Sequence, residues 1–330
     1  YTSSPIQSKY CEKAIYKSEA LIFGTGGNPS VHYCNEPFST STDCLVLYGN
    51  NDKVNLELIY YYLFSNIHIL ENGFKGAGLK HISANYILNI NIDLLNESVQ
   101  NEILNKIKLI DKLISKKKEQ LNKLDIAIKS RFVEMFGNPV SNPYSLPEDT
   151  LPNLGKFGRG ISKHRPRNDI KLLGGKYPLI QTGDVANAGL YITSYSSTYS
   201  ELGLKQSKMW DKGTLCITIA ANIAKTAILE FDACFPDSVV GFIGNERTNN
   251  IFIHYWFSFF QAILESQAPE SAQKNINLKT LSELKVIVPE KKKQDQFAAF
   301  VAQTDKSKFE SKLYIKIIRK IERRVAYDKF

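Results

Sequence analysis

The sequence of 330 residues is poor in sulfur-containing residues and has no long apolar run. It contains two methionines and five cysteines, and the cysteines form no Cys-x-x-Cys pair. An odd set of scattered cysteines indicates reduced thiols, and no cysteines or histidines are spaced as zinc ligands. The most apolar stretch, residues 251–264, is interrupted by polar residues and is too short to span a membrane. The chain also opens without a signal peptide, so we expect a cytoplasmic protein without membrane contact.

The excess of positive charge, +9 overall, lies in two segments. Residues 96–136 carry 9 basic and 6 acidic side chains, and residues 290–330 carry 12 and 6, which leaves the remainder neutral. Within that neutral remainder, residues 155–176 hold seven lysines or arginines against one aspartate. This distribution indicates a polyanionic partner such as nucleic acid.

The sequence matches itself when it is shifted by 194 residues. Sixteen of 82 aligned positions are identical, whereas composition alone predicts roughly five. Asn55 aligns with Asn249, for example, and Tyr61 with Tyr255. Each copy then enters a long charged segment, so we interpret the chain as a covalent pseudo-dimer and not as a solenoid, which needs more copies.

The repeat divides the chain into four parts. We predict a first globular domain over residues 1–95, a first long helix over 96–136, a second domain over 137–289 and a second long helix over 290–330. The first copy has no counterpart of residues 138–194, and the sequence opens without methionine. We therefore expect the leading part of the first domain to be missing from this sequence.

Both charged segments have the periodicity of a coiled coil. Apolar residues in the first recur in alternating steps of four and three, with Lys117 in the one polar position. About 40 helical residues would make a rod of about 60 Å. The second segment repeats the spacing over fewer positions, which predicts an antiparallel pair. The predicted seam consists of Ile103, Ile107, Ile110, Ile114, Leu121, Leu124, Ile128, Tyr314, Ile318, Ile321 and Val325.

The globular parts mix strand and helix patterns. Short β-branched or apolar runs at 214–218, 227–229, 239–243 and 285–288 predict strands, and residues 251–265 predict a helix whose aromatic side chains face a core. The expected fold class is therefore mixed α+β: two irregular α/β domains related by a pseudo-two-fold repeat and separated by two long helices that form an antiparallel coiled coil.

No set of residues indicates catalysis in both copies. Phe23–Gly27 resembles a methyltransferase cofactor turn, but Thr25 takes the place of its first glycine, so turn geometry explains these glycines better. Pro236-Asp237 and Glu283-Leu-Lys285 carry the letters of a metal-dependent nuclease, yet the first copy keeps only Asp43. The five histidines are isolated from any nucleophile or metal-ligand motif.

Three passages are distinctive: the junction Asn275–Pro289 with the following Lys293–Phe297 and Asp305, the junction Lys129–Pro139, and Tyr177–Val185. They resemble the specificity subunits of type I restriction–modification systems, the HsdS family. The resemblance extends over essentially the whole chain. The sequence departs from the family pattern at two places. The acidic residue before the junction glutamine is Asp295, and the first copy has Val99 in place of an acidic residue before Gln100.

The resemblance implies a non-catalytic subunit. Each globular part would be a target-recognition domain that reads one half of a bipartite, asymmetric double-stranded DNA sequence. The helices would act as spacer and as docking site for two methyltransferase subunits, through which the restriction and translocation subunit joins. S-adenosylmethionine, ATP and Mg²⁺ would be bound by those partners and not by this chain, which would lie in the cytoplasm at the nucleoid of a bacterial or archaeal cell.

The basic loop from Arg159 to Lys171 is the foremost candidate for DNA contact. Its lysines and arginines can bind phosphates, and Arg165 or Arg167 can reach guanine edges. Polar residues after the predicted strand near 180 are candidates for hydrogen bonds to bases. The complete set of candidates is Arg159, Lys163, His164, Arg165, Arg167, Lys171, Gln181, Thr182, Asp184, Asn222, Lys225 and Lys274, with Asn28, Lys80 and His81 in the first copy.

Two other functions stay open at this point. The chain could be a coiled-coil adaptor whose basic helices bind an acidic protein, with no sequence-specific DNA binding. Less favoured is the Pro-Asp…Glu-x-Lys nuclease, in which Asp237 would hold a metal ion.

Overall fold

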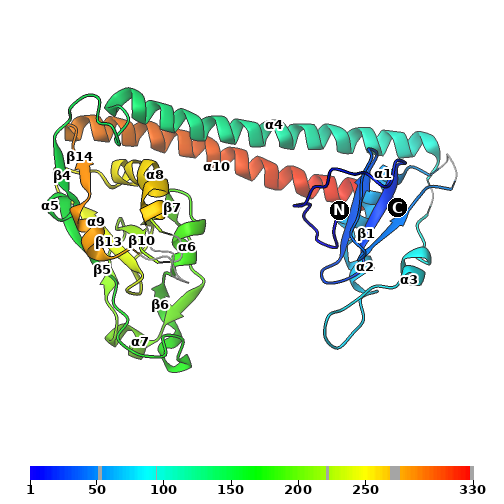
Figure 1. Ribbon diagram of the computed structural model, residues 1–330, viewed down its shortest axis with the longest axis horizontal. Helices are drawn as coiled ribbons and strands as arrows, with labels where there is room; N and C mark the ends of the chain where they lie inside the picture. The colour runs from blue at the N-terminus through cyan, green and yellow to red at the C-terminus, as the bar shows by residue number, and fades with distance from the viewer. Residues whose placement is uncertain (51–53, 94, 221–222, 268–275, 328–330) are drawn as a thin grey trace. The chain divides into compact units, whose positions relative to one another are not determined.

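The computed structural model describes residues 1–50, 54–93, 95–220, 223–267 and 276–327. They form two compact units (Figure 1). Unit 1 comprises residues 1–121 and 309–330, and unit 2 comprises residues 122–308. This division differs from the four predicted parts because each unit contains a globular part together with one end of both long helices.

Unit 1 contains a three-stranded antiparallel sheet in the order β2-β1-β3. Side chains of β1 alternate between two small cores: Leu21 and Phe23 pack with α1, and Ala20 and Ile22 pack with Phe38 on the other face. The elements are β1 (Ala20–Gly24), β2 (Ser30–Cys34), β3 (Cys44–Leu47), α1 (Leu56–Ser65), α2 (His68–Glu71) and α3 (Ala84–Leu88).

Unit 2 contains a five-stranded sheet in the order β5-β13-β10-β11-β7, a four-stranded sheet in the order β8-β6-β12-β9, and the pair β14-β4. Its strands are β4 (Glu148–Thr150), β5 (Gly155–Arg159), β6 (Leu173–Leu179), β7 (Tyr191–Ile192), β8 (Ser197–Tyr199), β9 (Met209–Trp210), β10 (Leu215–Thr218), β11 (Thr226–Leu229), β12 (Ala233–Cys234), β13 (Val239–Gly244) and β14 (Lys285–Ile287). Its shorter helices are α5 (Leu151–Leu154), the 3-10 helix η1 (Ile170–Leu172), α6 (Thr182–Asn187), α7 (Glu201–Lys205), α8 (Asn250–Gln267) and α9 (Leu278–Glu283).

The predicted strands and the aromatic helix of unit 2 are confirmed. The strands correspond to β10, β11, β13 and β14, and the helix is α8. Leu215 and Ile217 face α8, where Trp256 is completely buried, whereas Cys216 faces the opposite core around Trp210. The five-stranded sheet is therefore covered on both faces, as its nearly continuous apolar strands require.

The repeat is visible in both units. Shifted by 194 residues, β1, β2 and β3 fall on β10, β11 and β13, which pair in the same antiparallel order. One backbone hydrogen bond recurs at the same shift: Ile82 N–H donates to Thr25 at 3.0 Å, and Ile276 N–H donates to Ile219 at 3.0 Å. The predicted mixed α+β class with two repeated units is therefore confirmed.

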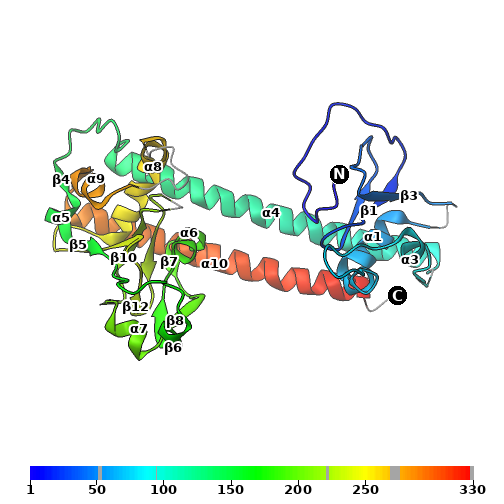
Figure 2. The ribbon, with the colours of Figure 1, turned by 60° about the horizontal axis from the view of Figure 1, so that its bottom comes forward.

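The two long helices are α4 (Glu97–Phe136) and α10 (Lys291–Tyr327). They run side by side and antiparallel in both ribbon views (Figures 1 and 2). In unit 1, Val325 packs with Ile103 and Ile107, and in unit 2 Lys308 forms an ion pair with Asp125 at 2.7 Å. The helix pair is thus bound by contacts within each unit.

The predicted seam holds for α4 and is partly wrong for α10. Ile103, Ile107, Ile114 and Ile128 are buried, and Ile110, Leu121 and Leu124 are half-buried. On α10, Ile318 is buried and Val325 half-buried, but Tyr314 and Ile321 are 40% and 49% exposed. The buried positions there include Thr304 and Ser311. Hydrophobicity alone misplaced this seam because small polar side chains occupy part of it.

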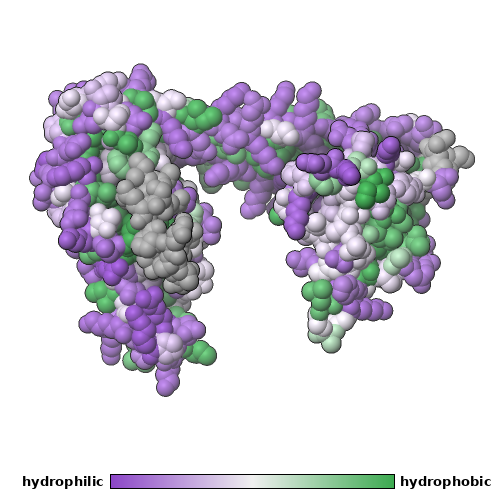
Figure 3. All heavy atoms as spheres, in the orientation of Figure 1, coloured by the Kyte–Doolittle hydropathy of each residue, from purple (hydrophilic) through white to green (hydrophobic). Residues whose placement is uncertain are grey.

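Tyr314 still contacts the other helix. The Lys117 ammonium group lies 5.3 Å from the centre of its ring, a cation–π distance. The single polar position in the α4 seam is therefore matched by an aromatic ring on α10. Elsewhere on the visible face of the helices, hydrophilic side chains dominate, with hydrophobic patches between them (Figure 3).

Candidate nucleic-acid interface

The predicted basic loop leaves the edge strand β5 and is held close to β13. Gly160 donates its N–H to Val239 at 2.9 Å. A Cβ atom at Gly160 would lie 2.2 Å from the Phe235 carbonyl oxygen, so only glycine permits this close approach. The loop therefore begins at a fixed point on the five-stranded sheet.

A second anchor lies at the end of α7. Lys163 N–H donates to the Gln206 backbone carbonyl at 3.4 Å, and His164 N–H donates to the Gln206 side chain at 3.0 Å. Within the loop, His164 Nε2 lies 3.0 Å from Asp169. The Lys171 backbone N–H lowers the pKa of the Asp169 carboxyl group, and His164 adds to the effect. The loop is thus an ordered structure with internal and external supports.

The third anchor is Asp237, just before β13. Its Oδ1 lies 2.5 Å from an Arg167 nitrogen, and its Oδ2 lies 3.4 Å from an Arg165 nitrogen. The structure therefore brings together the two predicted base-reading arginines on one carboxylate that is distant in sequence. All three side chains are partly exposed to solvent.

A cleft of about 340 Å³ opens beside this cluster. Arg159, Arg167, Asp237, Ser238 and Asn277 provide its polar lining, and Ile219, Ala220 and Ile276 its apolar lining. The two arginines outnumber the one carboxylate, so the described lining is electropositive. Charge of this sign on an open surface suits a phosphate or the acceptor edge of a base.

Further lysines extend the basic surface toward β9. The Lys208 ammonium group lies 3.9 Å from the centre of the buried Trp210 ring, and that of Lys156 lies 5.8 Å from it. Both charges are thus positioned by one aromatic side chain. The end of unit 2 around α7 and β6 is largely hydrophilic in Figure 3.

The candidates after the predicted strand near residue 180 have structural roles at α6. Asp184 accepts the Gln181 backbone N–H at 2.7 Å, which caps the N-terminus of α6, and it also accepts the Ser196 hydroxyl at 3.2 Å. Thr182 is the first residue of α6 and is half-buried. A role of these residues in base recognition stays a prediction, and capping already explains the type of side chain at 184.

The lower-ranked candidates divide between the two units. In unit 2, Lys225 is half-buried and donates to Gln261 at 3.2 Å. Asn222 and Lys274 lie outside the described residues.

In unit 1, the structure gathers all three candidates at one turn. Asn28 lies in the exposed turn between β1 and β2, where Gly27 has a φ of 83°. Gly27 N–H donates to the Lys80 carbonyl at 3.2 Å, and Gly26 bridges to His81. Asn28, Lys80 and His81 thus lie on neighbouring loops, and their role in DNA contact stays a prediction.

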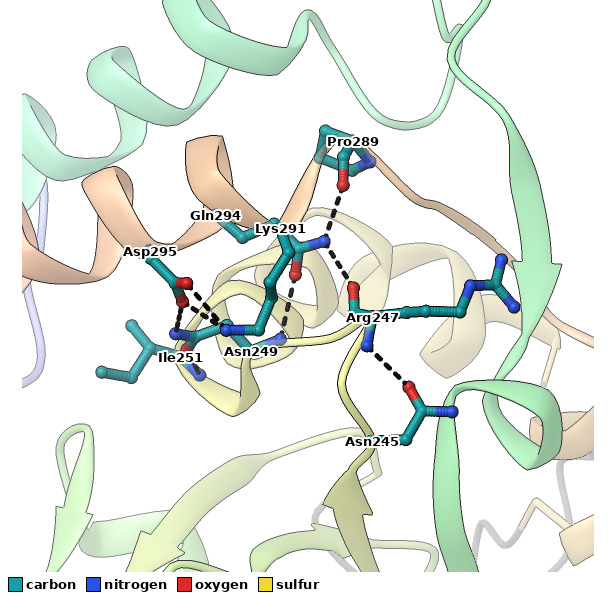
Figure 4. Close-up of polar contacts among 8 residues, drawn as sticks. All are labelled: Asn245, Arg247, Asn249, Ile251, Pro289, Lys291, Gln294 and Asp295. Atoms are coloured by element: carbon teal, nitrogen blue, oxygen red, sulfur yellow. Dashed lines mark hydrogen bonds and ion pairs between the residues drawn. The ribbon is translucent and has the colours of Figure 1, made fainter.

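Sequence reasoning missed a buried glutamine at the start of each long helix. Gln294 is completely buried; its amide donates to the carbonyls of Arg247 at 3.0 Å and Pro289 at 2.8 Å, and accepts from Asn249 N–H at 2.9 Å (Figure 4). We call Gln294 with these three partners the glutamine cluster. It connects the loop before α8 with the first turns of α10.

The same arrangement occurs in unit 1. Gln100 is 4% exposed, donates to the Leu95 carbonyl at 2.7 Å and accepts from Asn55 N–H at 3.2 Å. Gln100, Leu95 and Asn55 align with Gln294, Pro289 and Asn249 at the shift of 194 residues. The repeat alignment contained this correspondence between Gln100 and Gln294. The glutamine of the family-like junction, however, is the neighbouring Gln296, which follows the acidic Asp295 and is exposed.

The carboxylates of the nuclease interpretation are engaged elsewhere. Asp237 pairs with two arginines, and Glu283, the last residue of α9, pairs with Lys279 at 3.7 Å. Among the residues that the structure describes, no group of three His, Cys, Asp or Glu side chains could hold a metal ion. Over the same residues, no helix has the length and apolarity needed to cross a membrane.

Comparison with known proteins shows the family. A family model for the type I restriction modification DNA specificity domain matches residues 2–125 and, again, 153–323. The chain therefore belongs to the type I restriction–modification DNA specificity family, and its role is that of a DNA sequence-specificity subunit.

Solved structures agree in fold. A chain from a study of complex assembly and conformational transition of the type I restriction–modification system matches with a TM-score of 0.61 at 14% identity, over 94% of this chain and 83% of that one. The type I restriction–modification S subunit from M. genitalium matches with a TM-score of 0.56 at 16% identity, over 99% and 86%. At such identities the likeness concerns the fold and not individual side chains.

Proposed function

We propose that each unit reads one half of a bipartite, asymmetric DNA target. The observation that carries this proposal is one scaffold with two unlike surfaces. Strand order and the buried glutamine recur in both units, whereas only 16 of 82 aligned positions are identical. A covalent pseudo-dimer of this kind can bind two different half-sites, which a homodimer with two-fold symmetry cannot.

The chain itself would contribute recognition without catalysis. The carboxylates that could serve a nuclease are paired with cations in unit 2. S-adenosylmethionine, ATP and Mg²⁺ would then be bound by the methyltransferase and translocase subunits. This division of labour accords with the family to which the chain belongs.

The helix pair would be the docking site for two methyltransferase subunits, and through them for the restriction subunit. Four apolar side chains follow one face of α10 in unit 1 at steps of four residues: Phe309, Leu313, Ile317 and Ile321. They are 68%, 46%, 49% and 49% exposed. A contiguous exposed apolar stripe on a helix is typical of a protein interface, and we call it the α10 stripe.

The decisive experiment is to assemble the chain with its methyltransferase subunits and sequence the modified bases of a DNA library. We expect one motif with two different half-sites and a fixed spacer. Filter binding in rising salt should also show weakening with a log–log slope of several units. An adaptor would show neither a motif nor any sequence dependence of affinity, and a palindromic motif would contradict two unlike readers.

A further inference from the structure

The two arginines on Asp237 have different local surroundings. Arg165 Nη1 donates to the carbonyls of Ser162 at 2.6 Å and His164 at 2.8 Å, and its Nη2 faces Asp237 at 3.4 Å. Both terminal nitrogens of this guanidinium are thus committed to its own loop and its anchor. Arg165 is therefore placed as a brace of the loop.

Arg167 is placed differently. One of its terminal nitrogens pairs with Asp237 Oδ1 at 2.5 Å, its side chain is 45% exposed, and it lines the 340 Å³ cleft. A guanidinium has five N–H donors in a rigid plane, so an ion pair through one nitrogen holds the group beside the cleft and leaves other donors for a ligand. A guanine edge, with O6 and N7 as adjacent acceptors, matches such a fork.

Asp237 is itself well fixed. It lies in a turn closed by Val239 N–H donating to Pro236 at 3.0 Å, directly before the buried start of β13. One oxygen faces the brace and the other faces the cleft-lining arginine. The carboxylate therefore couples the support of the loop to the position of the Arg167 guanidinium.

We propose that Arg167 is the guanine-reading side chain of the second half-site and that Asp237 is its positioning residue. This inference rests on the proposed function and deepens it at one site. Holding the guanidinium group beside the cleft before DNA arrives lowers the entropy that binding must otherwise remove. Arg165 supports the loop without touching a base.

The test uses the full chain assembled with its methyltransferase subunits and the modified-base motif as readout. Arg167→Ala should relax one base pair of the second half-site by about 5- to 150-fold in discrimination, the contribution of one bidentate base contact. Arg167→Lys keeps the charge and loses the planar fork, so it should relax the same base pair while the salt dependence stays unchanged. Asp237→Asn should relax that base pair too, by a smaller factor than Arg167→Ala does.

Lys163→Ala is the matched control on the same loop. Loss of a phosphate contact should weaken all sequences equally and lower the salt slope by about one, with the motif intact. The first half-site is an internal reference in every variant, because Arg167 belongs to unit 2. Thermal melting of each assembled variant separates misfolding from altered reading.

Three results would overturn the inference. The first is an unchanged motif with Arg167→Ala, and the second is an unchanged motif with Asp237→Asn together with tighter binding to every sequence, which would make Asp237 a mere competitor of DNA. The third is a loss of base discrimination in the second half-site that Arg165→Ala causes and Arg167→Ala does not. In each case the wild-type motif would still stand, whereas failure of the proposed function would show as a wild-type complex without any motif.

Discussion

His254 on α8 is a neutral side chain in the structure at pH 7. Burial lowers its pKa from 6.5 to about 4; the hydrogen bond to Thr226, 2.9 Å from Nδ1, raises it in part, and the nearby Lys308 lowers it further. In the first copy the aligned residue is Tyr60, so this position serves packing and not chemistry.

The lowered pKa predicts that acid destabilises unit 2. In the unfolded chain His254 binds a proton near pH 6.5, whereas the folded state resists protonation until about pH 4, so stability is fully present above 6.5 and is lost as pH falls through that window. Between pH 7.5 and 5.0 the loss from this group amounts to about 2 kcal/mol. Urea denaturation of wild type and His254→Gln at both pH values measures it. The variant should lose less stability than wild type, and equal losses would contradict the assignment.

At the scale of residues, the sequence predicted which loop carries the positive charge but not which residues anchor that loop. The cluster of lysines and arginines between 155 and 176 is visible as composition. Asp237, however, is 72 residues away from Arg165, and only the pairing of β5 with β13 brings it beside the loop. Asp184 shows the opposite case: its spacing from Gln181 is local, and a capping interpretation was available from the sequence.

At the scale of elements, the glutamine cluster fastens the globular part of unit 2 to α10, and the contacts of Gln100 do the same for α4 in unit 1. Gln294→Leu would keep the volume and leave buried carbonyls and one N–H without their partners, so we expect unit 2 to lose about 3 kcal/mol of stability. Gln100→Leu should act similarly on unit 1. Denaturation in urea with fluorescence of Trp210 and Trp256, which both lie in unit 2, follows the first variant.

Gln296→Leu is the control for this prediction, since Gln296 is exposed on the same turn of α10. It should change stability by no more than about 0.5 kcal/mol. Equal effects of the two substitutions would show that helix propensity, and not the buried hydrogen bonds, determines the stability of the junction.

The α10 stripe predicts a loss of assembly without a loss of stability. Phe309→Ala combined with Ile317→Ala removes two exposed side chains, so the chain should fold as before while its affinity for methyltransferase subunits falls more than about tenfold. Titration calorimetry of the two components measures the affinity. Ile126→Ala, an exposed apolar residue of α4 outside the stripe, is the control, and a similar loss there would argue against a defined docking face.

The long helices show which element-scale predictions succeed. The α4 seam was predictable because isoleucines and leucines occupy almost every inward position. On α10 the buried positions include Thr304 and Ser311, whereas Phe309 and Ile317 are exposed. Hydrophobic residues of α10 lie on the outward face as well as the inward one, so hydrophobicity alone placed Tyr314 and Ile321 in the seam although both are partly exposed.

At the scale of the whole molecule, the repeat is the feature that sequence alone predicts best. Identity at 16 of 82 positions set a shift at which strands and a backbone hydrogen bond of the two units correspond. The same shift, continued to residue 100, also aligns the buried glutamines. The surfaces that differ between the units could not be predicted, since loops such as that around Arg165 depend on contacts from distant strands.

The helix pair, finally, predicts the spacing of the DNA target. Lys117 faces Tyr314 within unit 1, so residues 112–118 of α4 lie opposite residues 313–319 of α10 in the antiparallel pair. Deleting both seven-residue segments removes one heptad from each helix, preserves the pairing on either side, and shortens the pair by about 10 Å. If the helices act as the spacer, the motif should lose about three base pairs between its half-sites.

Deleting residues 112–118 alone is the contrasting variant. It shifts α4 against α10, so that Val325 no longer meets Ile103 and Ile107, and should destabilise the chain instead of yielding a shorter spacer. Sequencing of modified bases reads the spacer directly. A double deletion that folds, methylates DNA and keeps the wild-type spacer would show that the helices do not determine the distance between the half-sites.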